Sequence, residues 1–219
     1  MKVAIDGPAG AGKSTIARMC AKKLGFIYID TGAMYRAAAV YAIENGININ
    51  AEAITDDILD KIKIDITYTD GMQHIFLCGN DVSERIRESD ASKGASDIAV
   101  IPAVRVKLVE LQRGLALGRN VIMDGRDIGT YVLPDAELKI FLTASVDERA
   151  KRRFAELVQK GVQADFEEVK RDIEYRDKND SERDFAPLRR AEDATVVDSS
   201  DMTADEAAEY IIGLIKEKM

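Results

Sequence analysis

The sequence predicts an α/β protein in which a parallel sheet is covered by helices on both faces. Short apolar strands alternate with amphipathic helices along most of the 219 residues, and strands that are apolar on both sides are typical of a buried parallel sheet. With 46% apolar and 32% charged residues, the chain has the composition of a globular protein. Its length lies between one and two average domains.

The first part of the chain shows two strand–helix pairs. Ile16, Cys20 and Leu24 recur every four residues, which marks the buried face of a helix and makes Cys20 a core residue. A β-favouring run comes before each helix. The predicted order is a strand over 2–6, a helix over 13–24, a strand over 26–29 and a helix over 33–45.

The next segment, residues 49–96, differs in character and is interpreted as an inserted subdomain. Apolar and polar residues alternate over 62–68, which is the period of a half-buried strand. Asp70-Gly71 is a hairpin signal, and residues 75–78 are the expected partner strand. The expected division is a core domain over 1–48 and 97–219 and an insert that includes a short helix over 53–61.

The rest of the chain returns to the strand–helix alternation. Pro102 suits the first turn of a helix, and Val104 and Leu108 begin its core face. Ser145 is placed to cap a charged helix. The predicted elements are a helix from 102 that Gly118 ends, strands over 120–124 and 138–143, helices over 145–160 and 165–179, a strand over 195–198 and a helix over 203–218.

Residues 7–14, GPAGAGKS, fit the phosphate-binding pattern GxxxxGK[ST] and lie between a strand and a helix, as that motif requires. The glycines let backbone N–H groups turn toward phosphate oxygens, and the helix N-terminus adds partial positive charge. Lys13 can reach the β- and γ-phosphates, and Ser14 can ligate Mg²⁺. The predicted ATP-binding residues of this loop are Gly7, Pro8, Ala9, Gly10, Ala11, Gly12, Lys13, Ser14 and Thr15.

The phosphate loop by itself leaves the class of protein open. A GTPase needs a DxxG motif and an NKxD motif. The DGRD stretch at 124–127 does not match the first, and the second does not occur. The chain is also compact for a motor ATPase. A small kinase is therefore the first interpretation.

Arginines recur where the strands of the sheet are expected to end, which is where ligands bind in open α/β sheets. A kinase that brings two anions together needs such positive charge, although arginine-rich helices are often only solvated surfaces. One group has a spacing that would put it on one helical face, namely Arg176, Asp180 and Arg183. The other arginines are Arg36, Arg126, Arg149, Arg152 and Arg153.

Three longer motifs are similar to those of bacterial cytidylate kinases: GPAGAGK at 7–13, DTGAMYR at 30–36 and DGRDIGT at 124–130. Shorter stretches extend the similarity over essentially the whole chain, which therefore resembles this family of P-loop nucleoside monophosphate kinases. The resemblance implies transfer of a phosphoryl group from ATP to CMP or dCMP, with Mg²⁺. It also implies a five-stranded parallel sheet in the order 2-3-1-4-5, with residues 49–96 as the monophosphate-binding subdomain and a helical lid over about 147–165.

The resemblance implies roles for individual residues as well. Thr31, Tyr35, Arg36 and Arg126 would surround the CMP phosphate, beside Asp30 of the same motif. Ser96, Arg105 and Asp127 would read the cytosine, and Arg176, Asp180 and Arg183 would hold ribose and phosphates. Arg149, Arg152 and Arg153 would close over ATP and be exposed while the lid is open. The expected catalytic residues are Lys13, Arg126, Arg153 and Arg176; Ser14 is a variable position, because many members have glycine there.

Alternatives remain for the base and for the function. Asp127 could accept a hydrogen bond from the amino group of cytosine, which uracil lacks, or it could only pair with a neighbouring arginine. A kinase with another acceptor, such as UMP or a metabolite hydroxyl, is a second function, and Asp30 or Asp127 would then be available as a base. A nucleotide-binding regulator without turnover is a third.

The net charge and the cysteine content limit the classes of partner and the compartment expected for the protein. The 39 acidic and 31 basic residues give a net charge of −8, which argues against a domain-wide basic surface for nucleic acid. No apolar run approaches the roughly 20 residues that span a bilayer, and the first residues lack the apolar stretch of a signal peptide. Cys20 and Cys78 lie far apart, so no disulfide framework is expected. We expect a cytoplasmic monomer that acts on small molecules, without nucleic acid or membrane partners.

Overall fold

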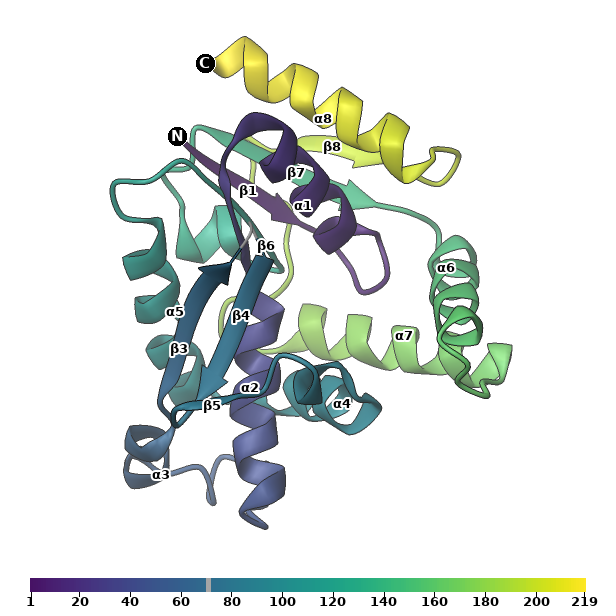
Figure 1. The fold of residues 1–219 in the computed structure, drawn as a ribbon. Coiled ribbons are helices and arrows are strands. Elements are labelled where there is room, and N and C mark those ends of the chain that lie inside the picture. The colour runs from purple at the N-terminus through teal and green to yellow at the C-terminus, as the bar shows by residue number, and fades with distance from the viewer. Residues whose placement is uncertain (70–71) are drawn as a thin grey trace.

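A computed structural model describes residues 1–69 and 72–219. Within them, five parallel strands form the central sheet in the order β2-β6-β1-β7-β8 (Figure 1). Numbered along the sheet's own strands, this is the order 2-3-1-4-5, so the predicted topology is confirmed. The strands are β1 (Lys2–Asp6), β2 (Ile27–Asp30), β6 (Val121–Gly125), β7 (Leu138–Thr143) and β8 (Thr195–Asp198).

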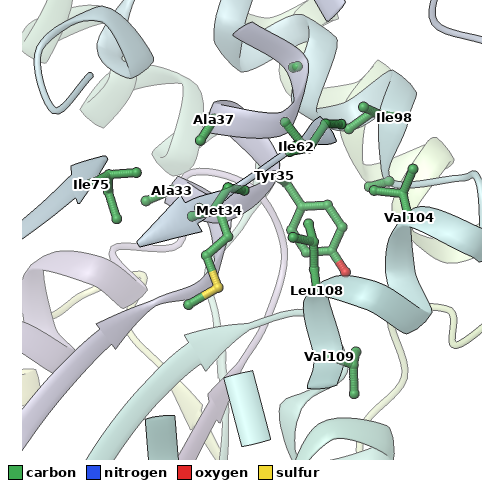
Figure 2. Packing of buried hydrophobic residues seen from close by; sticks show 14 of the residues in the cluster. Ala33, Met34, Tyr35, Ala37, Ile62, Ile75, Ile98, Val104, Leu108 and Val109 are labelled. Carbon is green, nitrogen blue, oxygen red and sulfur yellow. The ribbon is translucent and has the colours of Figure 1, made fainter. Parts of the chain in front are cut away.

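Helices cover both faces of this sheet because its strands are apolar on both sides. Val3 and Ile5 of β1 pack with helices α1 (Lys13–Leu24) and α8 (Ala204–Lys218). Ala4, which points to the opposite face, packs with α2 (Thr31–Glu44) and α5 (Pro102–Ala116). Figure 2 shows part of this second cluster, which includes side chains of α2 and α5. Cys20 lies fully buried in the first cluster, as predicted.

The insert contains an antiparallel sheet, as the alternating pattern predicts. Strand β3 (Ile64–Thr69) pairs with β4 (Met72–Leu77), and Ile64 lies opposite Leu77. The predicted Asp70-Gly71 turn lies outside the described residues. The segment also contains α3 (Asp56–Lys61), β5 (Asn80–Asp81), a 3₁₀ turn (Arg85–Arg87) and most of the unpredicted helix α4 (Ser89–Ile98), which ends two residues beyond it.

Helix α4 joins the insert to the core. A Cβ at Gly94 would lie 3.0 Å from the Cβ of Ala39 in α2, so the two helices approach closely. Ile75 of the insert and Met123 of the central sheet belong to one hydrophobic cluster. The division at 49–96 stays a prediction, but the core of the protein continues across it.

Two charged helices form an arm at one end of the molecule. They are α6 (Val146–Gln159) and α7 (Phe166–Glu182). The two helices pack against each other, and α7 runs from α6 toward α4, which it contacts (Figure 1). Ser145 caps α6 by accepting a hydrogen bond from the N–H of Glu148, as predicted. The arm has a small core of its own, built around Ala150, Val169 and Ile173.

Several predicted bounds were wrong by one to three residues. Helix α2 begins at Thr31 instead of Ala33, because the Asp30 carboxylate caps it by accepting from the N–H of Ala33. The strand predicted over 75–78 already begins at Met72. Among the described residues, no helix has the length and apolar character needed to cross a membrane.

Candidate active site

The phosphate loop joins β1 to α1 and is held close to the sheet. A Cβ at Gly7 would lie 1.9 Å from the carbonyl oxygen of Leu142, so only glycine fits. Gly12 has φ 87°, a left-handed conformation that glycine adopts without strain. Helix α1 has no side-chain cap and no acidic residue in its first turn. Its N-terminus is therefore suited to an anion.

Lys13 lies at the first position of α1 and is 5% exposed. Its ammonium donates to the carbonyl oxygen of Pro8 at 2.7 Å, so it lies against the loop that it follows. Burial and the nearby Arg126 lower the pKa of Lys13. An anionic phosphate beside the ammonium would raise this pKa and stabilise the charged side chain, as expected of a phosphate ligand.

Asp124 lies beside Ser14 at the end of β6. Its carboxylate accepts from the Ser14 hydroxyl and from the Tyr28 hydroxyl, both at 2.9 Å. Burial raises the pKa of Asp124, and the charge of Asp30 adds to this effect. Asp124 and Tyr28 were not among the predicted site residues, although a polar residue at the end of a buried strand was a signal for Asp124.

The DTGAMYR motif forms the junction between β2 and α2. Asp30 accepts from the guanidinium of Arg36 at 2.9 Å and caps the helix with its other oxygen. The Thr31 hydroxyl donates to the carbonyl oxygen of Asp124 at 2.7 Å, which ties the motif to β6. Gln73 of the insert accepts from the N–H of Asp30 at 2.9 Å. No pattern around Gln73 in the sequence indicated this contact.

Arginines and aspartates that line the cavity form a network, in which Arg105, Asp127, Asp180 and Arg183 are buried and Arg126 and Arg176 are partly exposed. The guanidinium of Arg105 donates to Oδ2 of Asp127 at 2.5 Å, and Arg183 donates to Oδ1 at 3.2 Å. Arg126 donates to Asp180 at 2.6 Å. Burial opposes the charge on Asp180, but Arg126 and Arg183 outweigh it and hold its pKa below the usual value.

Two guanidinium groups of the network, those of Arg126 and Arg176, lie close enough to repel each other. Arg176 lies near Arg126 and Asp180, and burial together with Arg126 lowers its pKa. Asp124, Asp172 and Asp177 also lie near enough to attract Arg126 or Arg176. An anion placed between Arg126 and Arg176 would relieve the repulsion between these two guanidinium groups. The arrangement is therefore electrostatically prepared for phosphate.

Two predictions about this region were wrong. Helix α7 ends at Glu182, and Arg183 has an extended backbone, so Arg176, Asp180 and Arg183 do not share one helical face. Arg183 still reaches Asp180, at 3.5 Å, because the chain turns back there. Arg149 was expected to be exposed, but it is 4% exposed and donates to the carbonyl oxygen of Ala9 at 2.7 Å.

The other two arginines of α6 lie closer to solvent. Arg152 donates to the Ser199 hydroxyl at 3.1 Å, and Arg153 donates to Glu156 at 2.9 Å. Both line the cavity described next, whereas Arg149 does not. The three predicted lid arginines therefore have different surroundings.

One cavity of about 890 Å³ connects the phosphate loop to the arginine network. It is within the usual size range of ligand sites. Gly7, Pro8, Ala9, Ala11 and Arg149 do not line it. The predicted residues that do are Gly10, Gly12, Lys13, Ser14, Thr15, Asp30, Thr31, Tyr35, Arg36, Ser96, Arg105, Arg126, Asp127, Arg152, Arg153, Arg176, Asp180 and Arg183.

A phosphate loop at the first strand–helix junction, facing a second cationic site across one cavity, defines a P-loop phosphotransferase. Solved structures with this fold include a protein from Eubacterium ventriosum described as uncharacterised, with a TM-score of 0.55 and 12% identity; the alignment covers 99% of this chain and 98% of that one. A gluconokinase from Sinorhizobium meliloti has a TM-score of 0.50 and 13% identity, with 99% and 93% covered.

The sequence comparisons identify the family. Residues 3–217 match the family described as cytidylate kinase. A cytidylate kinase of Caldicellulosiruptor saccharolyticus is 52% identical over 214 residues, which cover 98% of this chain and 95% of that protein. A cytidylate kinase of Lactobacillus gasseri is 48% identical, with 100% and 95% covered. The chain belongs to the cytidylate kinase family.

Proposed function

We propose that the chain transfers the γ-phosphoryl group of ATP to CMP or dCMP and so forms CDP or dCDP for pyrimidine nucleotide metabolism. The observation that carries this proposal is a set of five arginines that line the same cavity as the phosphate loop, namely Arg36, Arg105, Arg126, Arg176 and Arg183. A hydroxyl acceptor would bring no phosphate of its own to the arginines opposite the phosphate loop. Membership of the cytidylate kinase family supports the same substrates.

The part of the cavity beside the phosphate loop, here called the donor half, would hold ATP mainly through the backbone. The part lined by the arginine network is called the acceptor half. The N–H groups at the start of α1 have no capping side chain, and the first turn of the helix contains no acidic residue, so these groups are available to phosphate oxygens. Lys13 would neutralise charge on the β- and γ-phosphates. Arg153 is a suitable partner for the transferring group because it lines the cavity.

The acceptor half would hold CMP by its phosphate and by its base. Thr31, Tyr35, Arg36 and Arg126 are proposed to surround the phosphate, and Arg176, Asp180 and Arg183 to hold ribose and phosphates. Ser96, Arg105 and Asp127 are proposed for the cytosine. Among the described residues, Nε of Arg105 is a buried donor without a partner. A carbonyl or ring nitrogen of the base would satisfy it.

The donor set beside the phosphate loop fits Mg²⁺. The Ser14 hydroxyl and the Asp124 carboxylate are 2.9 Å apart, and a hydroxyl, a carboxylate and phosphate oxygens are the ligands that Mg²⁺ prefers. Within residues 1–69 and 72–219, no group of three or more acidic, histidine or cysteine side chains is placed to hold a metal ion by itself, so phosphate oxygens would have to complete the site. When bound, Mg²⁺ would neutralise charge on the ATP phosphates.

The residues around the cavity support transfer by placement and charge neutralisation. The acceptor is a phosphate anion at neutral pH, so no general base is required. Lys13 and the arginines would stabilise the charge that develops on the transferring group. Closure of the α6–α7 arm would exclude water and so limit hydrolysis of ATP.

An ADP-release assay with each nucleoside monophosphate tests the proposal. We expect rapid turnover with CMP and dCMP, slower turnover with UMP and none without an acceptor. Faster turnover with a hydroxyl acceptor would replace the proposal by another small-molecule kinase. ATP binding without turnover would indicate a regulator.

We also propose that the protein acts as a cytoplasmic monomer, without nucleic acid or membrane partners. The net charge of −8 supports the absence of nucleic acid partners. Light scattering of the purified protein tests the oligomeric state, and a dimer at micromolar concentration would contradict it.

A further inference from the structure

The peptide groups on both sides of Ala9 are held by two charged side chains from the α6–α7 arm. Oδ1 of Asp177 accepts from the N–H of Ala9 at 3.0 Å. The carbonyl oxygen of Ala9 accepts from Nη1 of Arg149 at 2.7 Å, and the same Nη1 donates to Oδ2 of Asp177 at 2.6 Å. The three residues therefore form a closed ring of hydrogen bonds between the phosphate loop and the two helices.

The arm also packs directly on the next residue of the loop. A Cβ at Gly10 would lie 3.2 Å from the Cβ of Arg149 and 3.4 Å from a methyl group of Ile173. Nε of Arg149 donates to the carbonyl oxygen of Ala144 at 3.0 Å, which fixes the guanidinium from its other side. Arg149 is therefore held in place independently of any ligand.

Ala9 needs these partners because its backbone lies outside every helix and strand. Buried backbone groups without a partner are costly, and Pro8 before it contributes no N–H. The orientation of the peptide groups around Ala9 affects the path of the following residues, whose N–H groups line the phosphate site. Contacts at Ala9 can therefore act on phosphate affinity without touching the phosphate.

We propose that Arg149 and Asp177 are positioning residues that clamp the backbone of Ala9 and keep the phosphate loop in its binding shape. This assigns to Arg149 a role through the loop instead of the direct contact with ATP that the family resemblance implies. The proposal deepens the proposed function of the same site, and its turnover readout rests on that function. Its binding readout does not, because ATP affinity can be measured without CMP.

Two substitutions of Asp177 separate the contributions of its two contacts. In Asp177→Asn a carbonyl oxygen can still accept from the N–H of Ala9, but the charge that pairs with Arg149 is lost. In Asp177→Ala both contacts are lost. Glu174→Gln is the matched control, since Glu174 is an exposed acidic residue on the same helix. Arg149→Lys keeps the charge but replaces the planar guanidinium, which donates through both Nε and Nη1, by a single ammonium group.

Calorimetry should give an ATP dissociation constant about tenfold higher for Asp177→Ala, a smaller increase for Asp177→Asn and no change for Glu174→Gln. The KM for CMP should stay within about twofold of the parent, because the clamp acts on the donor half. In a double-mutant cycle, Arg149→Lys should add less to Asp177→Ala than it costs alone.

A folded Asp177→Ala variant with parental ATP affinity would overturn the proposal, as would a loss of melting temperature with no change in ATP affinity. If Asp177→Ala does not fold, Asp177→Asn and Arg149→Lys decide by the same criteria. If the parent binds ATP but does not phosphorylate CMP, the proposed function fails, and the series of dissociation constants still decides whether the clamp exists.

Discussion

The donor and acceptor halves of the cavity hold charge in different ways. The donor half is one continuous segment, in which the start of α1 and the side chain of Lys13 carry the positive potential. The acceptor half is a set of buried ion pairs between distant residues, such as Arg105 with Asp127 and Arg126 with Asp180. One half is built by backbone conformation, and the other by long-range pairing.

The difference predicts how each half responds to substitution. A buried pair that loses one partner leaves an uncompensated charge, so the acceptor half should lose stability together with function. Lys13 is buried near another cation, Arg126, and its only direct hydrogen-bond partner among the described residues is the carbonyl oxygen of Pro8. Its removal should cost chemistry and little stability.

The largest effect is expected for Lys13→Ala. Turnover should fall by about 10²- to 10³-fold, because an electrostatic stabiliser of the transferring group is lost. The melting temperature should stay equal or rise, since the variant no longer buries an ammonium. ADP release and thermal unfolding measure the two quantities. Turnover near the parental rate in a folded variant would remove the phosphate loop from the mechanism.

Asp127→Asn should affect both stability and specificity. Arg105 and Arg183 would keep their charges beside a neutral amide, which should cost roughly 3 kcal/mol of unfolding free energy. An amide can present a donor as well as an acceptor. We therefore expect kcat/KM for CMP to fall and the ratio of kcat/KM for CMP to kcat/KM for UMP to decrease.

Asp184→Asn is the control for Asp127→Asn, because Asp184 is exposed and follows Arg183 in the sequence. It should change neither the unfolding free energy nor kcat/KM for CMP. If CMP activity falls and the ratio of CMP to UMP stays fixed, Asp127 does not read the base. Its role would then be limited to neutralising the two arginines that contact it.

The same difference explains what the sequence could predict. The phosphate loop is contiguous, so its residue pattern is sufficient to locate it, and the strand–helix alternation is sufficient for the sheet and its two faces. Helix α4 was missed because its ten residues include Ser92, Gly94 and Ser96, which are poor helix formers. Its packing against α2 outweighs that preference.

Pairing between distant residues could not be read from the sequence. Arg105 and Asp127 were both proposed for the base, but nothing in their separate motifs indicates that they form a buried ion pair. Arg149 has the composition of a surface helix around it, and only the fold brings Ala9 and Asp177 to it. Such contacts depend on how α6 and α7 lie against the loop.

A more moderate effect is expected for Arg153→Ala on the exposed side of the arm. Among the described residues its guanidinium forms a hydrogen bond and ion pair only with Glu156, so unfolding free energy should change by no more than about 0.5 kcal/mol. If it acts when the arm closes, kcat should fall about tenfold. Steady-state kinetics and thermal unfolding together test this. Parental kcat with a lower melting temperature would make it a scaffold residue.

Asp6 joins the two halves and should give the smallest effect on turnover. It directly precedes the phosphate loop. Its carboxylate accepts from the N–H groups of Ile128 and Gly129, the two residues that follow Asp127, at 2.8 and 2.7 Å. Burial raises the pKa of Asp6 to about 7, although the two N–H groups oppose this. The folded protein therefore binds this proton more tightly than the unfolded chain does.

The sign of the pH dependence follows from that raised pKa. The protonated form of Asp6 contributes stability below about pH 4, and this contribution is lost as the pH rises through 7. Asp6→Asn does not titrate, so the unfolding free energy of the parent minus that of the variant should decrease between pH 5 and 7, by at most about 1.4 kcal/mol per pH unit. Urea unfolding of both proteins at pH 5, 6 and 7 measures this difference. If the difference in unfolding free energy is constant over that range, Asp6 is already ionised at pH 5, and the N–H groups of Ile128 and Gly129 stabilise its carboxylate.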